Sequence, residues 1–361
     1  MSSDQVIPKG YCSKAVLYAE STVLAIIQLT DIVLSILAIF LFILSFSKFQ
    51  KSRTVIHFNF KINIINAAIF ALIHAVSLVV TQLRSQIMYR TYRDPCDLLI
   101  PTWLILTLRV PQFVYVFGMP VVHFCSFVER TLATFFVKRY EVFGNWLGWI
   151  FALFTWTTVF FILYFLFHNE DFLAPRIYCG VTSEHSASSL LKIHYIVLFF
   201  DLGTTVGDIV LYIINKKQRN VRVVDYSLSK SYQLNENTVA LKWLLPLSFC
   251  HSICFSLYSM LSLIARQFGD GLDLVGYMET LEGSYVLMPI HIDAMLAMMI
   301  YLMKKKPKPL DLRRPSGTAA HEYFKHLKQQ WGITVISPKT PQKEATRRHY
   351  LRNVQNLYKK S

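Results

Sequence analysis

Seven stretches of about 20 residues or more are rich in Leu, Ile, Phe and Val and nearly free of charge. A helix needs about 20 apolar residues to cross the hydrocarbon core of a bilayer, and a helix in a soluble core is rarely so long. Only 16% of the chain is charged, compared with about 25% in an average soluble domain. We therefore predict an all-α fold, a bundle of seven transmembrane helices. The predicted spans are residues 23–45, 57–80, 103–127, 146–167, 190–214, 239–264 and 279–303.

Lys and Arg are distributed unequally between alternate gaps. Seventeen follow the first, third, fifth and seventh spans, and seven lie in the N-terminal segment and the remaining gaps. Because loops rich in Lys and Arg stay in the cytoplasm, we predict an outside N-terminus and a cytoplasmic C-terminus. The net charge of +15 then reflects this topology and an attraction to the anionic inner leaflet of the lipid bilayer, so we predict no nucleic-acid partner.

This topology divides the chain into three parts. Residues 1–22 form an extracellular N-terminal segment, residues 23–303 the membrane domain, and residues 304–361 a basic cytoplasmic tail. The start of the tail suits anionic lipid headgroups, and residues 319–331 are predicted to form a short amphipathic helix along the membrane surface.

The six cysteines fall into two groups. Three lie within predicted helices, where a thiol packs as a small apolar group: Cys125, Cys250 and Cys254. Cys12, Cys96 and Cys179 lie outside, where thiols form disulfides. We predict a Cys96–Cys179 bridge, which would hold the loop after the fourth span across the outer mouth of the bundle. A bridge through Cys12, or no bridge, stays open, because connectivity cannot be read from sequence.

Eight polar residues lie at membrane depth in the predicted outer halves of the spans, where an uncompensated charge is costly and is a site hypothesis by default. They would line a cavity that is open to the outside and binds a small polar or amphipathic molecule. The alternative is that they only satisfy one another, as Arg109 would with Glu282. The candidate ligand-binding residues are His74, Arg109, Gln112, His194, Tyr195, Tyr258, Glu282 and Tyr285.

A second polar set lies deeper in the spans. It comprises Asp31, Asp201, Asp208, His251, His291 and Asp293. His291 and Asp293 point about 200° apart on a helix, so they are not a mutual pair. We expect interhelical hydrogen bonds that hold one arrangement of the bundle, or an ion site.

Motifs for catalysis are absent from the sequence. It contains no HExxH, CxxC, Gly-rich phosphate loop or GxSxG. We predict that the protein is not an enzyme and has no cofactor and no metal site.

The inner end of the third span carries Glu129-Arg130-Thr131. An acid beside an Arg at this boundary can form an ion pair that breaks when the inner face of the bundle opens, which makes it a conformational lock. The alternative is an interfacial pair that only marks the end of the helix.

Two motifs carry a resemblance to a known family. One is Glu129-Arg130-Thr131 with the downstream Tyr140-Glu141, and the other is SLSKSYQLNEN at residues 227–237, before the helix that contains Pro246. With seven spans and an outside N-terminus, residues 12–306 resemble the nematode serpentine chemoreceptors of the Sra superfamily, class alpha or class alpha/beta. The match to rhodopsin-like receptors is looser, since the seventh span lacks Asn-Pro-x-x-Tyr.

The resemblance implies a G-protein-coupled receptor in the plasma membrane of sensory neurons or their cilia. Its expected partners are an extracellular small-molecule ligand and a heterotrimeric G protein, which would bind when the inner ends of the fifth and sixth spans separate. The candidate coupling residues are Glu129, Arg130, Lys216, Lys217, Arg219 and Arg222. The alternative is a seven-helix ligand-gated ion channel or transporter, in which the intramembrane acids mark an ion path; the absence of an internal repeat disfavours it.

Overall fold

A computed structural model describes residues 10–51, 57–136, 140, 144, 146–180, 184–221 and 228–304. For residues 184–185, 219–221, 228–235 and 270 it describes the backbone alone. The described residues all belong to one compact unit, Met1–Pro307. The predicted amphipathic helix and the rest of the tail beyond Lys304 lie outside the described residues.

Seven spans in the described part of the chain are long and apolar enough to cross a bilayer, which confirms the predicted all-α bundle. Six spans are single helices, and two consecutive helices form the seventh. Their bounds are α2 (Thr22–Lys51), α3 (Phe58–Thr91), α4 (Thr102–Phe135), α6 (Trp146–Phe167), α7 (Glu184–Val221), α8 (Leu228–Phe268), α9 (Leu274–Tyr285) and α10 (Leu287–Lys304).

Several helices extend beyond the apolar segments that predict them. Helix α8 starts at Leu228 rather than at residue 239, and α3 continues to Thr91 rather than ending at residue 80. Lys, Gln, Glu and Arg are good helix formers, so the backbone pattern continues where hydropathy falls. The seventh span is interrupted at Val286, and Pro289 lies in the first turn of α10, where a missing backbone N–H leaves no helical bond broken.

Helix α4 is the central element of the bundle. It packs against α3, α6, α7 and α8. In the most apolar 18-residue stretch of α4, 72% of the residues are buried, compared with 22% in the corresponding stretch of α2. The outward faces carry large apolar side chains, among them Leu153, Phe161 and Phe199, which suit contact with lipid tails.

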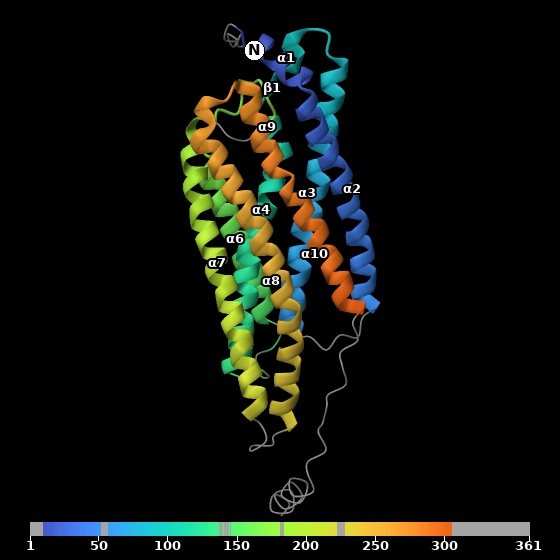
Figure 1. The fold of residues 1–361 in the computed structure, drawn as a ribbon, viewed down its shortest axis with the longest axis vertical. Helices are drawn as coiled ribbons and strands as arrows, with labels where there is room; N and C mark the ends of the chain where they lie inside the picture. The colour runs from blue at the N-terminus through green and yellow to red at the C-terminus, as the bar shows by residue number, and fades with distance from the viewer. Residues whose placement is uncertain are drawn as a thin grey trace, which may run out of the picture. The chain divides into compact units, whose positions relative to one another are not determined.

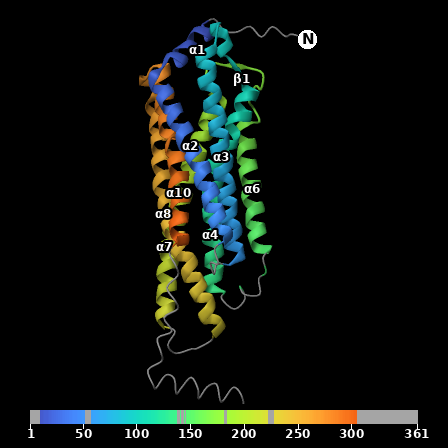
Figure 2. The ribbon, with the colours of Figure 1, turned by 90° about the vertical axis from the view of Figure 1, so that its right-hand side faces the viewer.

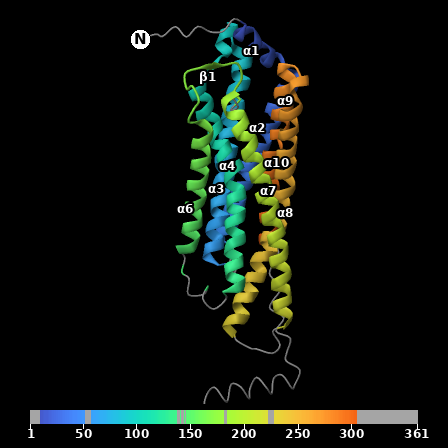
Figure 3. The ribbon, with the colours of Figure 1, turned by 90° about the vertical axis from the view of Figure 1, so that its left-hand side faces the viewer.

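Short elements gather at one end of the bundle, which we name the Cys12 end. They are α1 (Tyr11–Glu20), the 3-10 helices η1 (Pro95–Leu98) and η2 (Gly269–Gly271), and the antiparallel strands β1 (Ile100–Pro101) and β2 (Pro175–Arg176). Figure 1 shows α1, β1 and α9 together at this end. At the opposite end, named the Arg130 end, α7 and α8 project beyond α2, α3 and α6 in all three views (Figures 1, 2 and 3).

The disulfide of the structure joins Cys12 to Cys96, so the predicted Cys96–Cys179 bridge is wrong. Helix α1 packs directly against η1, which brings the two Cα atoms to 4.6 Å. Cys179 is buried after β2 with a free thiol, and its backbone carbonyl accepts a hydrogen bond from Arg109. Burial raises the pKa of this thiol, so it stays protonated and unreactive.

A peptide map under non-reducing conditions tests the pairing. We expect the Cys12 peptide to be linked to the Cys96 peptide, and the Cys179 thiol to be alkylated once the protein is unfolded. Cys12→Ser should lower the free energy of unfolding by about 2 to 4 kcal/mol, because the bridge closes a long loop. Cys96→Ser should have the same effect, and the double variant should be no worse. A Cys96–Cys179 peptide pair would contradict the assignment.

Candidate functional site

The first polar cluster lies near the Cys12 end, around Arg109 of α4. Arg109 forms a 2.8 Å ion pair with Glu282 of α9, and the two side chains are 5% and 9% exposed. Its Nε donates to the carbonyl of Cys179 at 2.8 Å, and its Nη1 lies 3.4 Å from Gln112 Oε1. Gln112 in turn donates to Thr81 Oγ1 of α3 at 3.0 Å. The guanidinium therefore connects α4, α9, α3 and the segment after β2.

Two histidine–tyrosine pairs continue this cluster into the bundle. His74 Nε2 of α3 lies 3.0 Å from the hydroxyl of Tyr285, and His194 Nε2 of α7 lies 3.3 Å from that of Tyr258. The Tyr258 and Tyr285 rings meet edge to face with centroids 5.9 Å apart. Seven of the eight predicted ligand-binding residues are thus buried in two chains of contacts, one around Arg109 and one through the Tyr258 and Tyr285 rings, which we together name the Arg109 cluster. Its members are His74, Arg109, Gln112, His194, Tyr258, Glu282 and Tyr285.

Tyr195 does not belong to this cluster. Its hydroxyl accepts a hydrogen bond from Gln267 of α8 at 2.8 Å, in an exposed position. His194 and Tyr195 are adjacent on α7, so their side chains point about 100° apart and only one of them can face the interior.

Unpaired polar atoms distinguish the Arg109 cluster from a closed network. Among the described residues, Glu282 Oε2, His74 Nδ1 and the Tyr178 hydroxyl are buried without a hydrogen-bond partner. Tyr178 packs on Tyr18 of α1, and burial raises its pKa well above the usual range, so its hydroxyl stays a donor. Buried polar groups nearly always have partners, so three orphans in one neighbourhood require an explanation.

A second cluster lies in the middle of the bundle around His123 of α4, which the sequence analysis did not single out. His123 Nδ1 lies 2.8 Å from Asp201 Oδ1, and its Nε2 lies 2.9 Å from Asp208 Oδ2. His251 of α8 contacts Asp201, and its Nδ1 lies 3.4 Å from His291 Nε2 of α10. Interhelical hydrogen bonds, one of the two predicted roles of the deeper acids and histidines, are therefore present.

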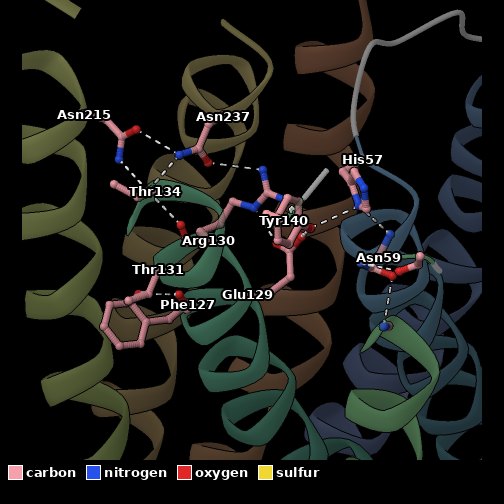
Figure 4. Close-up of polar contacts among 12 residues, drawn as sticks. His57, Asn59, Phe127, Glu129, Arg130, Thr131, Thr134, Tyr140, Asn215 and Asn237 are labelled. Carbon is pink, nitrogen blue, oxygen red and sulfur yellow. Dashed lines mark hydrogen bonds and ion pairs between the residues drawn. The ribbon is translucent and has the colours of Figure 1, made fainter. Parts of the chain in front are cut away.

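The third cluster lies at the Arg130 end (Figure 4). Glu129 accepts hydrogen bonds from Arg130 and from the hydroxyl of Tyr140. Burial and this carboxylate raise the pKa of Tyr140 well above its usual range, so the hydroxyl keeps the proton that it donates. The hydroxyl oxygen also lies 3.0 Å from His57 Nδ1, and burial lowers the pKa of His57, which favours the neutral ring. Glu129 and Arg130 are 0% and 1% exposed, so this pair is internal rather than interfacial.

Asn237 connects that ion pair to the other helices (Figure 4). Arg130 Nη1 donates to Asn237 Oδ1 of α8 at 3.2 Å. Asn237 Nδ2 donates to Thr134 Oγ1 of α4 at 2.7 Å and to Asn215 Oδ1 of α7 at 2.8 Å. Asn215 also donates to Thr134 at 2.8 Å. Two amide groups and one hydroxyl group therefore hold α4, α7 and α8 together at the Arg130 end.

The basic coupling candidates lie on the same end of the bundle. Lys216 and Lys217 are exposed on α7, one and two residues after the buried Asn215. Arg219 lies in α7, where the backbone alone is described, and Arg222 lies outside the described residues.

Sequence analysis missed the partners that complete these clusters. His123 is a lone histidine in an apolar run, and Asn215 and Asn237 are uncharged, so none stood out by charge. Two signals were available. A histidine within a span is itself a site hypothesis, and Asn237 ends the segment that carries the family resemblance.

Seven membrane-spanning helices with internal ionic clusters define a multi-pass helical membrane protein. Comparison with known proteins then gives the family: residues 10–332 match the serpentine type 7TM GPCR receptor class ab chemoreceptors, and the chain belongs to this family. The resemblance predicted from sequence is thereby confirmed.

Individual relatives agree with this assignment. Serpentine receptor class alpha-39 of Caenorhabditis elegans is 25% identical over 71% of this chain and 69% of its own length. Serpentine receptor class beta-17 of the same organism is 26% identical over 73% of both chains. Serpentine receptor class alpha-10 is 23% identical over 85% of this chain and 93% of its own length.

Proposed function

We propose that the protein is a chemosensory receptor that binds an extracellular small molecule in the Arg109 cluster and signals through a heterotrimeric G protein at the Arg130 end. The single observation that carries the ligand site is the group of unpaired atoms around Arg109. Glu282 Oε2 accepts, the Tyr178 hydroxyl donates, and His74 Nδ1 does either, depending on its tautomer. A small polar molecule with a donor and an acceptor would satisfy them.

The position of the cluster supports an outside ligand. It lies beneath α1 and β2, at the end that carries the Cys12–Cys96 bridge, and disulfides form in oxidising compartments. The positive-inside distribution of Lys and Arg places the same end outside. In this orientation Lys216 and Lys217 face the cytoplasm of a sensory neuron, next to the anionic inner leaflet, and the buried Arg130 lies at the same end of the bundle.

Signalling requires a ligand that binds an open state better than the closed one. A preference of about 100-fold contributes about 2.7 kcal/mol toward opening. The hydrogen bonds of Asn237 join the inner ends of α4, α7 and α8, so their loss is the step that would admit a G protein.

Charge reversal on α7 tests the coupling surface. We expect the double variant Lys216→Glu/Lys217→Glu to reduce ligand-independent nucleotide exchange on a co-reconstituted G protein about tenfold, because electrostatic attraction speeds encounter. Lys192→Glu is the matched control, since Lys192 is exposed on the same helix at its other end.

Epitope tags at Met1 and Ser361 establish on which side of the membrane each terminus lies, by antibody staining of intact and permeabilised cells. A cytoplasmic N-terminus, or equal exchange in all three proteins, would count against the receptor and favour ion-flux recording.

A further inference from the structure

The His123 cluster places two carboxylates against the imidazoles of His123 and His251. Both ring nitrogens of His123 face carboxylate oxygens, one on Asp201 and one on Asp208, and His251 also contacts Asp201. With neutral imidazoles, the two carboxylates leave a net negative charge in the middle of the bundle. Such a charge is costly in a region of low dielectric constant.

His251 supplies the second observation. Its side chain is 2% exposed, and its Nε2 has no hydrogen-bond partner among the described residues, although it lies 3.1 Å from Asp201 Oδ1. Tyr115, His291 and His251 form a chain of contacts behind it. When His291 donates from Nδ1 to Tyr115, its Nε2 accepts from His251 Nδ1. In this tautomer the lone pair of His251 Nε2 points at the Asp201 carboxylate, and the two groups form a binding position for a cation.

We propose that His123 Nδ1, Asp201 Oδ1 and His251 Nε2 bind a Zn²⁺ ion that joins α4, α7 and α8. The three donor atoms lie within 4.8 Å of one another. Zinc bonds to imidazole nitrogen and carboxylate oxygen are about 2.0 to 2.2 Å long, so tetrahedral donors lie about 3.4 Å apart. Asp201 Oδ1 lies 2.8 Å and 3.1 Å from the two nitrogens, so these two oxygen–nitrogen pairs need to open by a few tenths of an ångström.

The neighbouring groups form the outer shell that such a site requires. Ligating histidines usually donate their other N–H to a carboxylate or another acceptor, which fixes the ring and its tautomer. With zinc on Nδ1, His123 Nε2 donates to Asp208 Oδ2, and Ser248 donates to the same oxygen at 2.7 Å. On the other side His251 Nδ1 donates to His291.

One Zn²⁺ neutralises Asp201 and Asp208 while all the imidazoles stay neutral, a balance that would otherwise need protons on both His123 and His251. A mixed nitrogen and oxygen donor set suits zinc, whereas calcium and magnesium prefer oxygen alone. The sequence analysis left an ion site open among the deeper residues, which include Asp201 and His251, but it did not include His123, because the ligands come from three helices at separations that no metal motif has.

Zinc retention by the purified full-length protein tests the proposal. After treatment with a chelator, loading with zinc chloride and desalting, we expect one Zn²⁺ per chain that His251→Gln and Asp201→Asn each abolish. His194→Gln is the matched control, because His194 is a buried histidine of α7 outside the trio. Zinc at about 100 times its Kd should raise the Tm by roughly 5 °C in the unaltered and control proteins alone.

Two outcomes would overturn the site. One is no retained zinc in the unaltered protein, which leaves a proton as the cation. The other is equal retention in His251→Gln, which places the ion on other histidines. Substituting Co²⁺ for zinc distinguishes the proposed site from one on Cys250 and Cys254 of α8. Thiolate ligation gives an intense charge-transfer band, which a site made of two histidines and an aspartate lacks. If Asp201→Asn fails to fold, His251→Gln decides the question, and none of these readouts depends on G-protein signalling.

Discussion

Glu282→Gln is expected to lower the free energy of unfolding by about 3 to 5 kcal/mol, because it leaves the Arg109 guanidinium buried without its counter-charge. The amide keeps the shape of the carboxylate and can still accept a hydrogen bond, so the loss isolates the charge. The two atoms of the pair lie 2.8 Å apart, and neither side chain is more than 9% exposed. Thermal and denaturant unfolding of the purified protein in micelles gives the value.

Two further variants make this result specific. The double variant Arg109→Met/Glu282→Leu should recover most of the loss, since two apolar groups of similar volume need no compensation. Glu279→Gln is the control one turn away: its partly exposed carboxylate accepts from Ser21 at 2.6 Å, and its loss should cost about 1 kcal/mol or less. Equal destabilisation by Glu279→Gln and Glu282→Gln would show that the buried Arg109–Glu282 ion pair contributes no more to the free energy of unfolding than a partly exposed hydrogen bond does.

Asn237→Ala is expected to raise ligand-independent signalling. The variant removes three hydrogen bonds, one of them from the charged Arg130, that join α8 to α4 and α7. At about 1 kcal/mol for each bond, the equilibrium between closed and open arrangements shifts by about 3 kcal/mol, or roughly 100-fold. Nucleotide exchange on a co-reconstituted G protein, measured without ligand, reports the shift.

Thr131→Ala provides the comparison for this variant. Thr131 lies in the same turn of α4 as Arg130. Its hydroxyl donates at 2.8 Å to the Phe127 carbonyl of its own helix, so Thr131→Ala removes no interhelical bond (Figure 4). We expect basal exchange to stay unchanged in Thr131→Ala. A lower Tm in Asn237→Ala with unchanged exchange would mean that the hydrogen bonds support the fold and do not restrain signalling.

The fold was predictable because its signals are long and local. A span such as 146–167 is defined by continuous hydropathy, and the structure places α6 at Trp146–Phe167. The predicted spans for α3 and α8 were too short, since hydropathy reports the thickness of the bilayer and not the length of the helix. The break between α9 and α10 at Val286 was not predicted, because the hydropathy of the seventh span does not change there.

The sites were predictable where charge marked them. Arg109 and Glu282 were rare charges at membrane depth, and they form the ion pair that the sequence analysis suggested. Pairing of cysteines depends instead on where α1 folds back, which no spacing encodes, so Cys96 was assigned to the wrong partner. His123 and Asn237 were missed because their roles arise from partners on other helices.

The length of α8 determines how far its end at Leu228 would move if the helix pivoted within the bundle. The helix runs from Leu228 to Phe268, and the stretch from Leu228 to His251 measures about 35 Å at 1.5 Å per residue. Pivoting by about 10° at the level of His251 moves the far tip by about 6 Å. The projection of α7 and α8 past their neighbours would therefore amplify such a pivot: a small rotation near the packed rings of His251 and Phe255 would become a displacement on the scale of a whole side chain at the Arg130 end.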